Sequence, residues 1–108
     1  MKKLIYTPDA IEKLQDIEQY LKIMFGSETA AEVKNSLRSA IRTLKTTENI
    51  GSSVRDVYGI DTDYRKLFIN HYHIFYRIEP NVIRIIAIFH EREDFIRKMF
   101  GSDGSSNC

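Results

Sequence analysis

The chain has 108 residues and a formal net charge of +1, and 43% of its residues are hydrophobic. This length allows one domain with a buried core, and the composition excludes wholesale disorder. The near-zero charge gives no general argument for nucleic-acid binding, and the single cysteine, Cys108, excludes a disulfide within the chain and a metal site built from cysteines.

The first predicted elements are a short strand over residues 3–6 and a helix that begins directly after it. Thr7 is suited to the N-cap and Pro8 to the first helical position, and the charge of Asp9 is favourable against the helix dipole. Apolar residues recur at helical spacing along this segment, at Ile11, Leu14, Ile17 and Leu21, followed by Met24 or Phe25.

A second amphipathic helix follows almost at once, because Gly26 ends the first helix and Ser27 is suited to cap the next one. Its apolar stripe consists of Val33, Leu37, Ala40, Ile41 and Leu44. Two helices joined by so short a link are expected to form an antiparallel hairpin. The combined apolar stripe needs a second surface to cover it, and a sheet further along the chain would supply one.

Residues 46–63 show neither helical nor strand periodicity and are predicted to form a loop. Gly51, Gly59 and the neighbouring serines and aspartates are typical of turns, and the candidate anchors of the loop on the core are Val54, Val57 and Tyr58. A connection of this length inside a compact domain is uncommon and is often functional.

Residues 64–90 predict three consecutive strands joined by two tight turns, at residues 70–71 and 80–81. Asn tolerates the left-handed backbone region, and Pro presets the backbone for a turn and cannot donate to a ladder. With two-residue loops, the register pairs Ile69 with Tyr72 and Glu79 with Val82.

This register divides the three strands into two faces, because every second residue returns to the same face. The first, almost wholly apolar face comprises Leu67, Ile69, Tyr72, Ile74, Tyr76, Ile78, Ile83, Ile85, Ala87 and Phe89. The second face comprises Tyr64, Lys66, Phe68, His73, Phe75, Arg77, Arg84, Ile86, Ile88 and His90. We expect the helix hairpin to cover the first face and to leave the second face open to a macromolecule.

Some residues of the second face also have a structural interpretation. Arg77 and Arg84 face each other in this register, and like charges so placed repel unless an anion or a carboxylate lies between them. Glu79 and Glu91 are the candidate carboxylates. His73, which has aromatic neighbours in the sequence, has the alternative of a half-buried histidine of the sheet.

A short helix is predicted over residues 91–100, with Phe95, Met99 and Phe100 on its apolar side. Residues 101–108 form a tail rich in Gly, Ser, Asp and Asn that we expect to be disordered, so the predicted domain spans residues 1–100. The predicted class is α+β: a helix hairpin packed on one face of an antiparallel sheet, with the N-terminal strand at an edge or beside the last strand.

The sequence lacks the motifs of a membrane-spanning segment, a zinc site, a phosphate-binding loop and a nucleophile elbow. No apolar run approaches membrane-spanning length, and Pro8 and Asp9 interrupt the short apolar stretch after the N-terminal lysines, so we expect a soluble, cytoplasmic protein. The three histidines lack the spaced acids or cysteines of a zinc site. There is no Gly-rich phosphate loop and no nucleophile elbow, and we expect neither a metal nor a cofactor.

The order strand, helix hairpin, loop, three-strand meander and C-terminal helix resembles the RelE/ParE superfamily of type II toxin–antitoxin toxins. The resemblance extends over residues 2–100 and is carried by residues 6–10 (YTPDA), 64–67 (YRKL), 72–78 (YHIFYRI) and 88–94 (IFHERED). It implies a β-α-α-β-β-β bacterial growth-inhibiting toxin that a cognate antitoxin neutralises by burying apolar surface on it. A homodimer and a toxin–antitoxin hetero-oligomer are both open.

The superfamily contains two mechanisms, of which the first is ribosome-dependent mRNA cleavage by RelE-like members. Such an endoribonuclease needs a base, an acid and charge stabilisation for the phosphate. The candidate catalytic residues are His73, His90, Arg92 and Lys66, with Arg77 and Arg84 as further phosphate ligands. However, Phe68 stands where RelE-like enzymes carry an arginine, and Arg97 or Lys98 stands where they carry a catalytic tyrosine.

ParE-like members, the second group, inhibit DNA gyrase and perform no chemistry of their own. Residues 65–67 and 90–94 resemble ParE-like sequences more closely. We therefore favour a gyrase inhibitor over an mRNA interferase acting on the ribosome, with an inactive antitoxin-binding member as a third alternative, and whether the chain is an enzyme stays open. The candidate target-binding residues are Tyr64, Lys66, Arg77, Arg84, His90 and Arg92.

Overall fold

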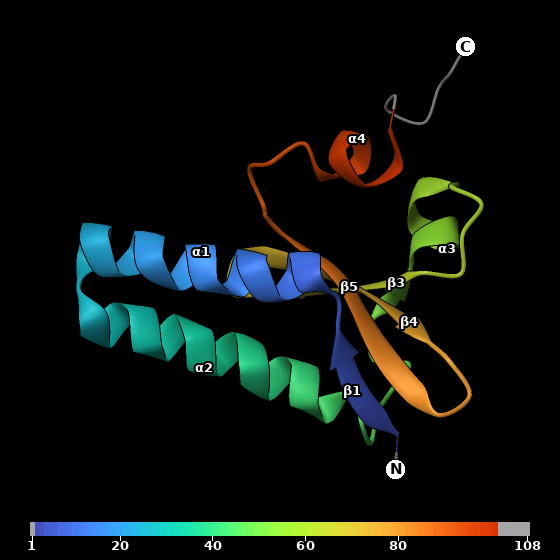
Figure 1. Cartoon of the computed structure of the whole chain (residues 1–108). Coiled ribbons are helices and arrows are strands. Elements are labelled where there is room, and N and C mark those ends of the chain that lie inside the picture. Colours follow the sequence, from blue (N-terminus) through green and yellow to red (C-terminus); the bar gives the residue numbers. More distant parts are fainter. Residues whose placement is uncertain (1, 102–108) are drawn as a thin grey trace.

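The computed structural model describes residues 2–101 and has an α+β fold with the predicted order of elements (Figure 1). In chain order the elements are β1 (Lys3–Tyr6), α1 (Pro8–Phe25), α2 (Ser27–Thr43), β2 (Ser52–Ser53), α3 (Val54–Tyr58), β3 (Arg65–Ile69), β4 (Tyr72–Ile78), β5 (Val82–His90) and α4 (Phe95–Phe100). The predicted strand, hairpin and meander are confirmed, and so is the C-terminal helix, which begins at Phe95 instead of Glu91. The segment predicted as a loop contains β2 and α3, and the predicted disordered tail lies outside the described residues apart from Gly101.

The strands form one five-stranded sheet in the order β1-β5-β4-β3-β2. The N-terminal strand lies at an edge and beside the last strand, as expected. However, β1 pairs with β5 in parallel, with Leu4 opposite Ile83, whereas the other neighbours are antiparallel. A parallel neighbour needs a long connection, and the helix hairpin and meander together supply one.

Local sequence signals determine the ends of the hairpin helices. The Thr7 hydroxyl oxygen accepts a hydrogen bond from the Ala10 N–H at 3.1 Å, and Pro8 takes the first helical position of α1. α1 ends at Gly26, whose φ of 99° favours glycine, and α2 begins directly after it. The two helices lie side by side and antiparallel, as predicted (Figure 1).

The main core lies between this hairpin and one face of the sheet. The helices contribute Ala10, Leu14, Ile17, Leu21, Ala30, Leu37 and Ile41, and the sheet contributes Tyr72, Ile74, Tyr76, Ile83, Ile85 and Ile88. Burial of this apolar surface is the main favourable term that holds the hairpin on the sheet. The hairpin therefore covers most of the face that was predicted to lie beneath it.

The turns of the meander follow the sequence signals. Asn70 and His71 have φ values of 51° and 74°, the left-handed pair of a type I′ turn, and Ile69 lies opposite Tyr72. At the second turn the Glu79 N–H donates to the Val82 carbonyl at 2.9 Å. Both predicted registers are confirmed next to their turns.

A β-bulge interrupts the pairing of β4 with β5. Phe75 lies opposite Ala87, but the next residue of β4, Tyr76, lies opposite Ile85, so Ile86 is an extra residue on β5. Because successive side chains of a strand point to opposite faces, every residue of β5 beyond the bulge is on the face opposite to the one expected from the turn.

The prediction for the second half of β5 was therefore wrong. Ile88 and His90 lie on the hairpin side of the sheet, and Ala87 and Phe89 lie on the other side. Ile88 is only 2% exposed within the main core, whereas the Phe89 ring lies 5.9 Å from the ring of Phe75. One inserted residue is the physical cause.

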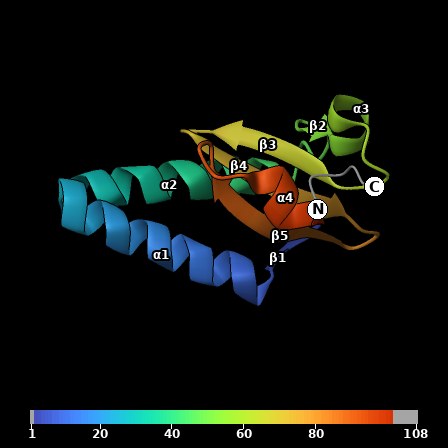
Figure 2. The same cartoon turned by 90° about the horizontal axis from the view of Figure 1, so that it is seen from above.

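The second face of the sheet was predicted to be open along its whole length, but this prediction was wrong. α3 and α4 cover one end of it, and Figure 2 shows α4 lying over β4 and β5. Phe75 is fully buried there, with its ring 6.0 Å from the rings of both Phe95 and Phe100. The ring of Tyr58 in α3 also lies 6.0 Å from that of Phe95. An aromatic cluster thus forms a second, smaller core opposite the hairpin.

Candidate functional site

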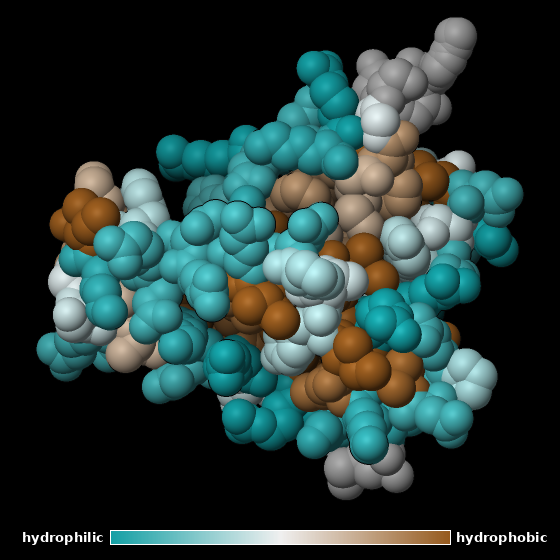
Figure 3. Space-filling view, viewed as in Figure 1, coloured by the Kyte–Doolittle hydropathy of each residue, from teal (hydrophilic) through white to brown (hydrophobic). Residues whose placement is uncertain are grey.

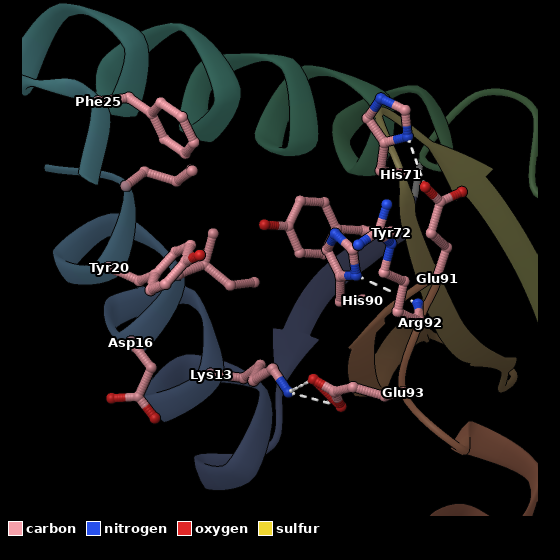
Figure 4. Close-up of a pocket in the computed structure, with 12 residues that line it drawn as sticks. Lys13, Asp16, Tyr20, Phe25, His71, Tyr72, His90, Glu91, Arg92 and Glu93 are labelled. Atoms are coloured by element: carbon pink, nitrogen blue, oxygen red, sulfur yellow. Dashed lines mark hydrogen bonds and ion pairs between the residues drawn. The ribbon is translucent and has the colours of Figure 1, made fainter. Parts of the chain in front are cut away.

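A groove of about 660 Å³ lies between α1 and the end of the sheet where β4 begins and β5 ends (Figure 4). One wall is α1, and the other is formed by the β3–β4 turn, the start of β4 and the segment after β5. Its lining residues are Lys13, Asp16, Ile17, Tyr20, Leu21, Phe25, His71, Tyr72, His90, Glu91, Arg92 and Glu93. The bulge in β5 is what turns His90 into this groove.

The groove has an apolar floor that continues onto exposed aromatic side chains. Ile17 and Tyr72 are buried, and the Tyr72 ring meets the His90 ring edge-on at 5.2 Å. Tyr20 and Phe25 are 55% and 62% exposed. Figure 4 shows Tyr20 across the groove from Tyr72 and His90, with Phe25 at one end. A concave apolar surface of this kind suits an amphipathic ligand.

An ion pair closes the end of the groove opposite Phe25 (Figure 4). Lys13 Nζ lies 2.6 Å and 3.0 Å from the two carboxylate oxygens of Glu93. Burial raises the pKa of Glu93, but the hydrogen bond and charge of Lys13, with the charge of Lys98, outweigh this effect and lower the pKa below its ordinary value. Glu93 is therefore ionised at neutral pH and ties the segment after β5 to α1.

Two histidines stand on the wall opposite α1. His71 Nδ1 lies 2.8 Å from a carboxylate oxygen of Glu91, and His90 Nδ1 accepts a hydrogen bond from the Arg92 N–H at 3.1 Å. His90 and Arg92 were predicted to belong with the residues of the second sheet face. The structure places them here instead, because the bulge and the end of β5 carry them to the hairpin side.

The other two candidate catalytic residues, His73 and Lys66, lie on the opposite face of the sheet. The His73 ring contacts those of Phe68 and Phe95 in tilted arrangements, with centroids at 4.8 Å and 4.1 Å, and its Nδ1 lies 3.0 Å from Lys66 Nζ. Burial, and then the charge of Lys66, lower the pKa of His73 to about 4. Burial also lowers the pKa of Lys66. His73 is therefore neutral at pH 7 and accepts a hydrogen bond from the lysine.

Arg77 and Arg84 lie opposite each other on the second face, as predicted. Arg84 donates from Nε and Nη2 to both oxygens of Glu79 at 2.8 Å and 3.0 Å, which confirms Glu79 as a partner. Arg77 donates to Asp63 at 3.1 Å, whereas Glu91, the other candidate carboxylate, lies at the groove. Each guanidinium is thus neutralised by its own carboxylate, which supports a structural role for the pair.

The predicted target-binding set is therefore divided among several places. His90 and Arg92 line the groove, and Lys66 lies beneath α4. Tyr64 also lies in the aromatic cluster, with its ring 6.2 Å from that of Phe100. Arg77 and Arg84 lie opposite each other elsewhere on the second face. The structure does not bring the six residues together into one surface.

Sequence reasoning missed most of the groove, namely Lys13, Tyr20, Phe25, His71 and Glu93. Ile11 and either Met24 or Phe25 were assigned to the apolar stripe of α1, but the three residues are 47%, 56% and 62% exposed. Ile23 beside them is 72% exposed. The run of three apolar residues at 23–25 was the available signal for an exposed apolar surface. Three consecutive residues of a helix cannot all lie on the one stripe that packs on a sheet, so some of them must be exposed.

Residues 2–101 contain neither a candidate metal site nor a helix that could span a membrane. No cluster of three or more His, Cys, Asp or Glu side chains is arranged to hold a metal ion in that part of the chain. None of the helices described has the length and apolar character required to cross a membrane.

Comparisons with known proteins support the resemblance. The family model described as the ParE toxin of the type II toxin-antitoxin system parDE matches residues 4–95. A solved structure of the chromosomal ParDE TA system from P. aeruginosa is similar in fold, with a TM-score of 0.69 and 22% sequence identity. That match covers 83% of this chain and 96% of the other. No curated protein matches the sequence.

Proposed function

Because this chain belongs to the ParE toxin family of type II toxin–antitoxin systems, we propose that it arrests bacterial growth by inhibiting DNA gyrase and that a cognate antitoxin neutralises it. The main observation that favours gyrase inhibition over mRNA cleavage is that the candidate nuclease residues lie on opposite faces of the sheet. The sheet stands between His90 and Arg92, at the groove, and His73 and Lys66, beneath α4.

RNA cleavage by general acid–base catalysis needs its groups within hydrogen-bonding reach of one phosphodiester. Groups on opposite faces of a sheet cannot meet at one phosphate. His73 is in addition packed against the Phe95 ring and has a pKa of about 4, so it is a weak base in a partly covered position. The arrangement supports a protein that acts by binding.

We assign the groove to the antitoxin. Its apolar floor, the ion pair of Lys13 with Glu93 at one end, and the exposed rings of Tyr20 on the α1 wall and Phe25 at the other end match the apolar and polar faces of an amphipathic helix. The exposed side chains of Ile23 and Met24 extend this surface to the tip of the hairpin. A surface of exposed aromatic and Met side chains with a charged rim has the composition of a protein interface.

The mechanism is tested by assaying the purified chain for gyrase-dependent cleavage of supercoiled DNA and, in parallel, for codon-phased mRNA cuts on ribosomes. The gyrase effect is expected in the wild type and in His73→Ala and His90→Ala, because neither imidazole performs chemistry. Ribosomal cuts that disappear in these two variants would show a nuclease and reject the gyrase mechanism.

The antitoxin assignment is tested with the double variant Tyr20→Ser, Phe25→Ser. Both rings are largely exposed, so the fold should be retained, while affinity for the antitoxin falls at least about 10-fold, as expected for interface anchors. The matched control is Ile50→Ser, Val57→Ser, which also removes two exposed apolar side chains, each 56% exposed, away from the groove. Equal loss of antitoxin binding in both double variants would contradict the assignment, and neither result depends on gyrase.

A further inference from the structure

Four basic residues form one row, which we call the basic row: Lys34, Arg38 and Arg42 of α2, and Lys45 of the turn that follows it. We propose that the basic row binds the phosphate backbone of duplex DNA. The choice of DNA as the ligand rests on the proposed function, since DNA gyrase acts on duplex DNA. The existence of an anion-binding surface does not rest on the proposed function.

The four side chains share one flank of the helix. At about 100° per residue, positions 34, 38, 42 and 45 fall within an arc of about 80°. At about 1.5 Å per residue they extend over about 16 Å, because α2 and the turn that follows it continue the same spiral. A straight row of this length can follow several successive phosphates of one strand.

Lys34 is paired with Glu18 of α1, but no acid within the same stretch of chain offsets the charges of Arg38, Arg42 and Lys45. No acidic residue occurs between Val33 and Thr47, whereas both acids of α2, Glu28 and Glu32, lie in its first half. Arg38 is exposed. A chain with a net charge of only +1 has therefore concentrated positive charge on one segment.

The neighbouring acids are already engaged. Glu18 of α1 is bound by Lys34 at 3.1 Å, and Glu48 is bound by Lys2 at 3.0 Å. Arg38 and Arg42 make no ion pair and no side-chain hydrogen bond within residues 2–101. These two guanidiniums are the groups free to bind an anion.

The C-terminal end of α2 lies beside β1 (Figure 1). Burial raises the pKa of the Tyr6 phenol, and the charges of Arg38 and Arg42 act in the opposite direction, which places both guanidiniums near this β1 side chain. Figure 3 shows hydrophilic residues over much of α2, with one apolar patch at the tip of the hairpin and another beside the C-terminal end of the helix. The basic row is thus separate from the groove assigned to the antitoxin.

An acidic peptide is the competing occupant, and the surface favours DNA. Protein interfaces need an apolar centre, yet the exposed residues next to the row on α2 are the small polar Asn35, Ser39 and Thr43. Hydroxyl and amide side chains together with arginines are what phosphate backbones contact. The composition of the basic row therefore suits a nucleic-acid backbone better than a peptide, whose apolar side chains would need an apolar surface to bind.

The test is fluorescence anisotropy of a labelled duplex of about 20 base pairs with the full chain, in salt from about 50 to 200 mM. The double variant Arg38→Glu, Arg42→Glu is expected to lose at least about 10-fold in affinity at the lowest salt. The slope of log affinity against log salt should become shallower by about 2, since about 0.9 is contributed per phosphate contact.

The matched control is Arg55→Glu, Arg97→Glu, which produces the same net charge with arginines on α3 and α4 that are 59% and 68% exposed. It should keep the wild-type slope and affinity within about 3-fold. Thermal unfolding checks that each variant is folded, and Arg38→Gln, Arg42→Gln provides a milder substitution of the same two residues.

Three results would overturn the proposal: no binding by the wild-type chain at about 50 mM salt, equal losses in the two glutamate variants, or displacement of the labelled duplex by polyglutamate as readily as by unlabelled duplex. The last result would assign the row to an acidic peptide. The assay contains no gyrase, so a toxin that failed to inhibit gyrase would leave this measurement valid.

Discussion

Tyr76 is a fully buried tyrosine whose hydroxyl organises the connection after α2. It donates to the Glu48 carbonyl at 2.8 Å and accepts from the Gly51 N–H at 3.0 Å. Arg65 adds hydrogen bonds to the carbonyls of Asn49 and Gly51. A Cβ at Gly51 would lie only 2.7 Å from the tyrosine hydroxyl, so the close approach requires glycine. Two side chains of the sheet thus satisfy a backbone that has no strand or helix of its own.

Replacing Tyr76 with Phe should lower the free energy of unfolding by about 1–3 kcal/mol, because both backbone partners lose their hydrogen bond in a buried site. Urea denaturation measures the difference. Tyr64→Phe is the control, since the Tyr64 hydroxyl has no hydrogen-bond partner within residues 2–101 and its loss should cost less than about 0.5 kcal/mol. Equal costs for the two variants would disprove the role of the Tyr76 hydroxyl.

His73 should make stability depend on pH. Its pKa is about 4 in the folded chain against an ordinary 6.5, so the unfolded chain binds the proton more tightly. Stability is then complete above about pH 6.5 and falls as pH decreases from there toward 4. After allowance for solvent screening, the loss is on the order of 1 kcal/mol.

Denaturation at pH 7 and pH 5 measures this loss, and the difference between wild type and His73→Phe isolates the imidazole from the carboxylates. An NMR titration of His73 gives the pKa directly. A midpoint near 6.5 would refute the half-buried, neutral state of the ring.

At the scale of elements, Thr7 couples the start of α1 to the bulge of β5. Its hydroxyl accepts from the Ala10 N–H and donates to the carbonyl of Ile86, the extra residue of the bulge, at 2.8 Å. The Thr7 N–H also donates to the Ile85 carbonyl at 3.0 Å. One side chain therefore begins the helix and satisfies a backbone group that the bulge leaves out of the ladder.

Thr7→Ala should cost about 1–3 kcal/mol, because it removes the N-cap and the hydrogen bond to the bulge together. Thr7→Ser keeps the hydroxyl and should cost much less. Ser53→Ala, which removes the cap of α3 alone, is a second comparison, since that hydroxyl accepts only from the Asp56 N–H. The explanation fails if the serine and alanine variants at position 7 unfold at the same urea concentration.

The whole molecule has apolar clusters on both sides of one sheet. The hairpin covers the larger cluster, and α3 and α4 cover the aromatic cluster around Phe75 (Figure 2). α4 is a short helix without a fully buried residue, so its attachment depends mainly on the rings of Phe95 and Phe100. The two covers are therefore expected to differ in local stability.

Phe95→Ala should uncover the His73 ring and raise its pKa from about 4 toward 6.5, since burial is the main cause of the shift. NMR titration of the variant measures this change. Hydrogen exchange of the β5 amides should remain close to wild type, because β5 also belongs to the larger cluster beneath the hairpin. Comparable deprotection of α4 and β5 would show that the clusters do not open separately.

The sequence by itself determined the elements other than β2 and α3, because helix periods, the Thr7-Pro8 start, the Gly26 end and the Asn70-His71 turn are local signals that act over a few residues. It did not determine the faces of β5, since residues 85–89 (IIAIF) are apolar throughout and carry no alternation from which a bulge could be recognised. Only the tertiary structure decided that His90 turns to the hairpin, that α4 covers His73, and that the groove forms against α1. These are contacts between segments far apart in the chain, and no local pattern specifies which segments meet.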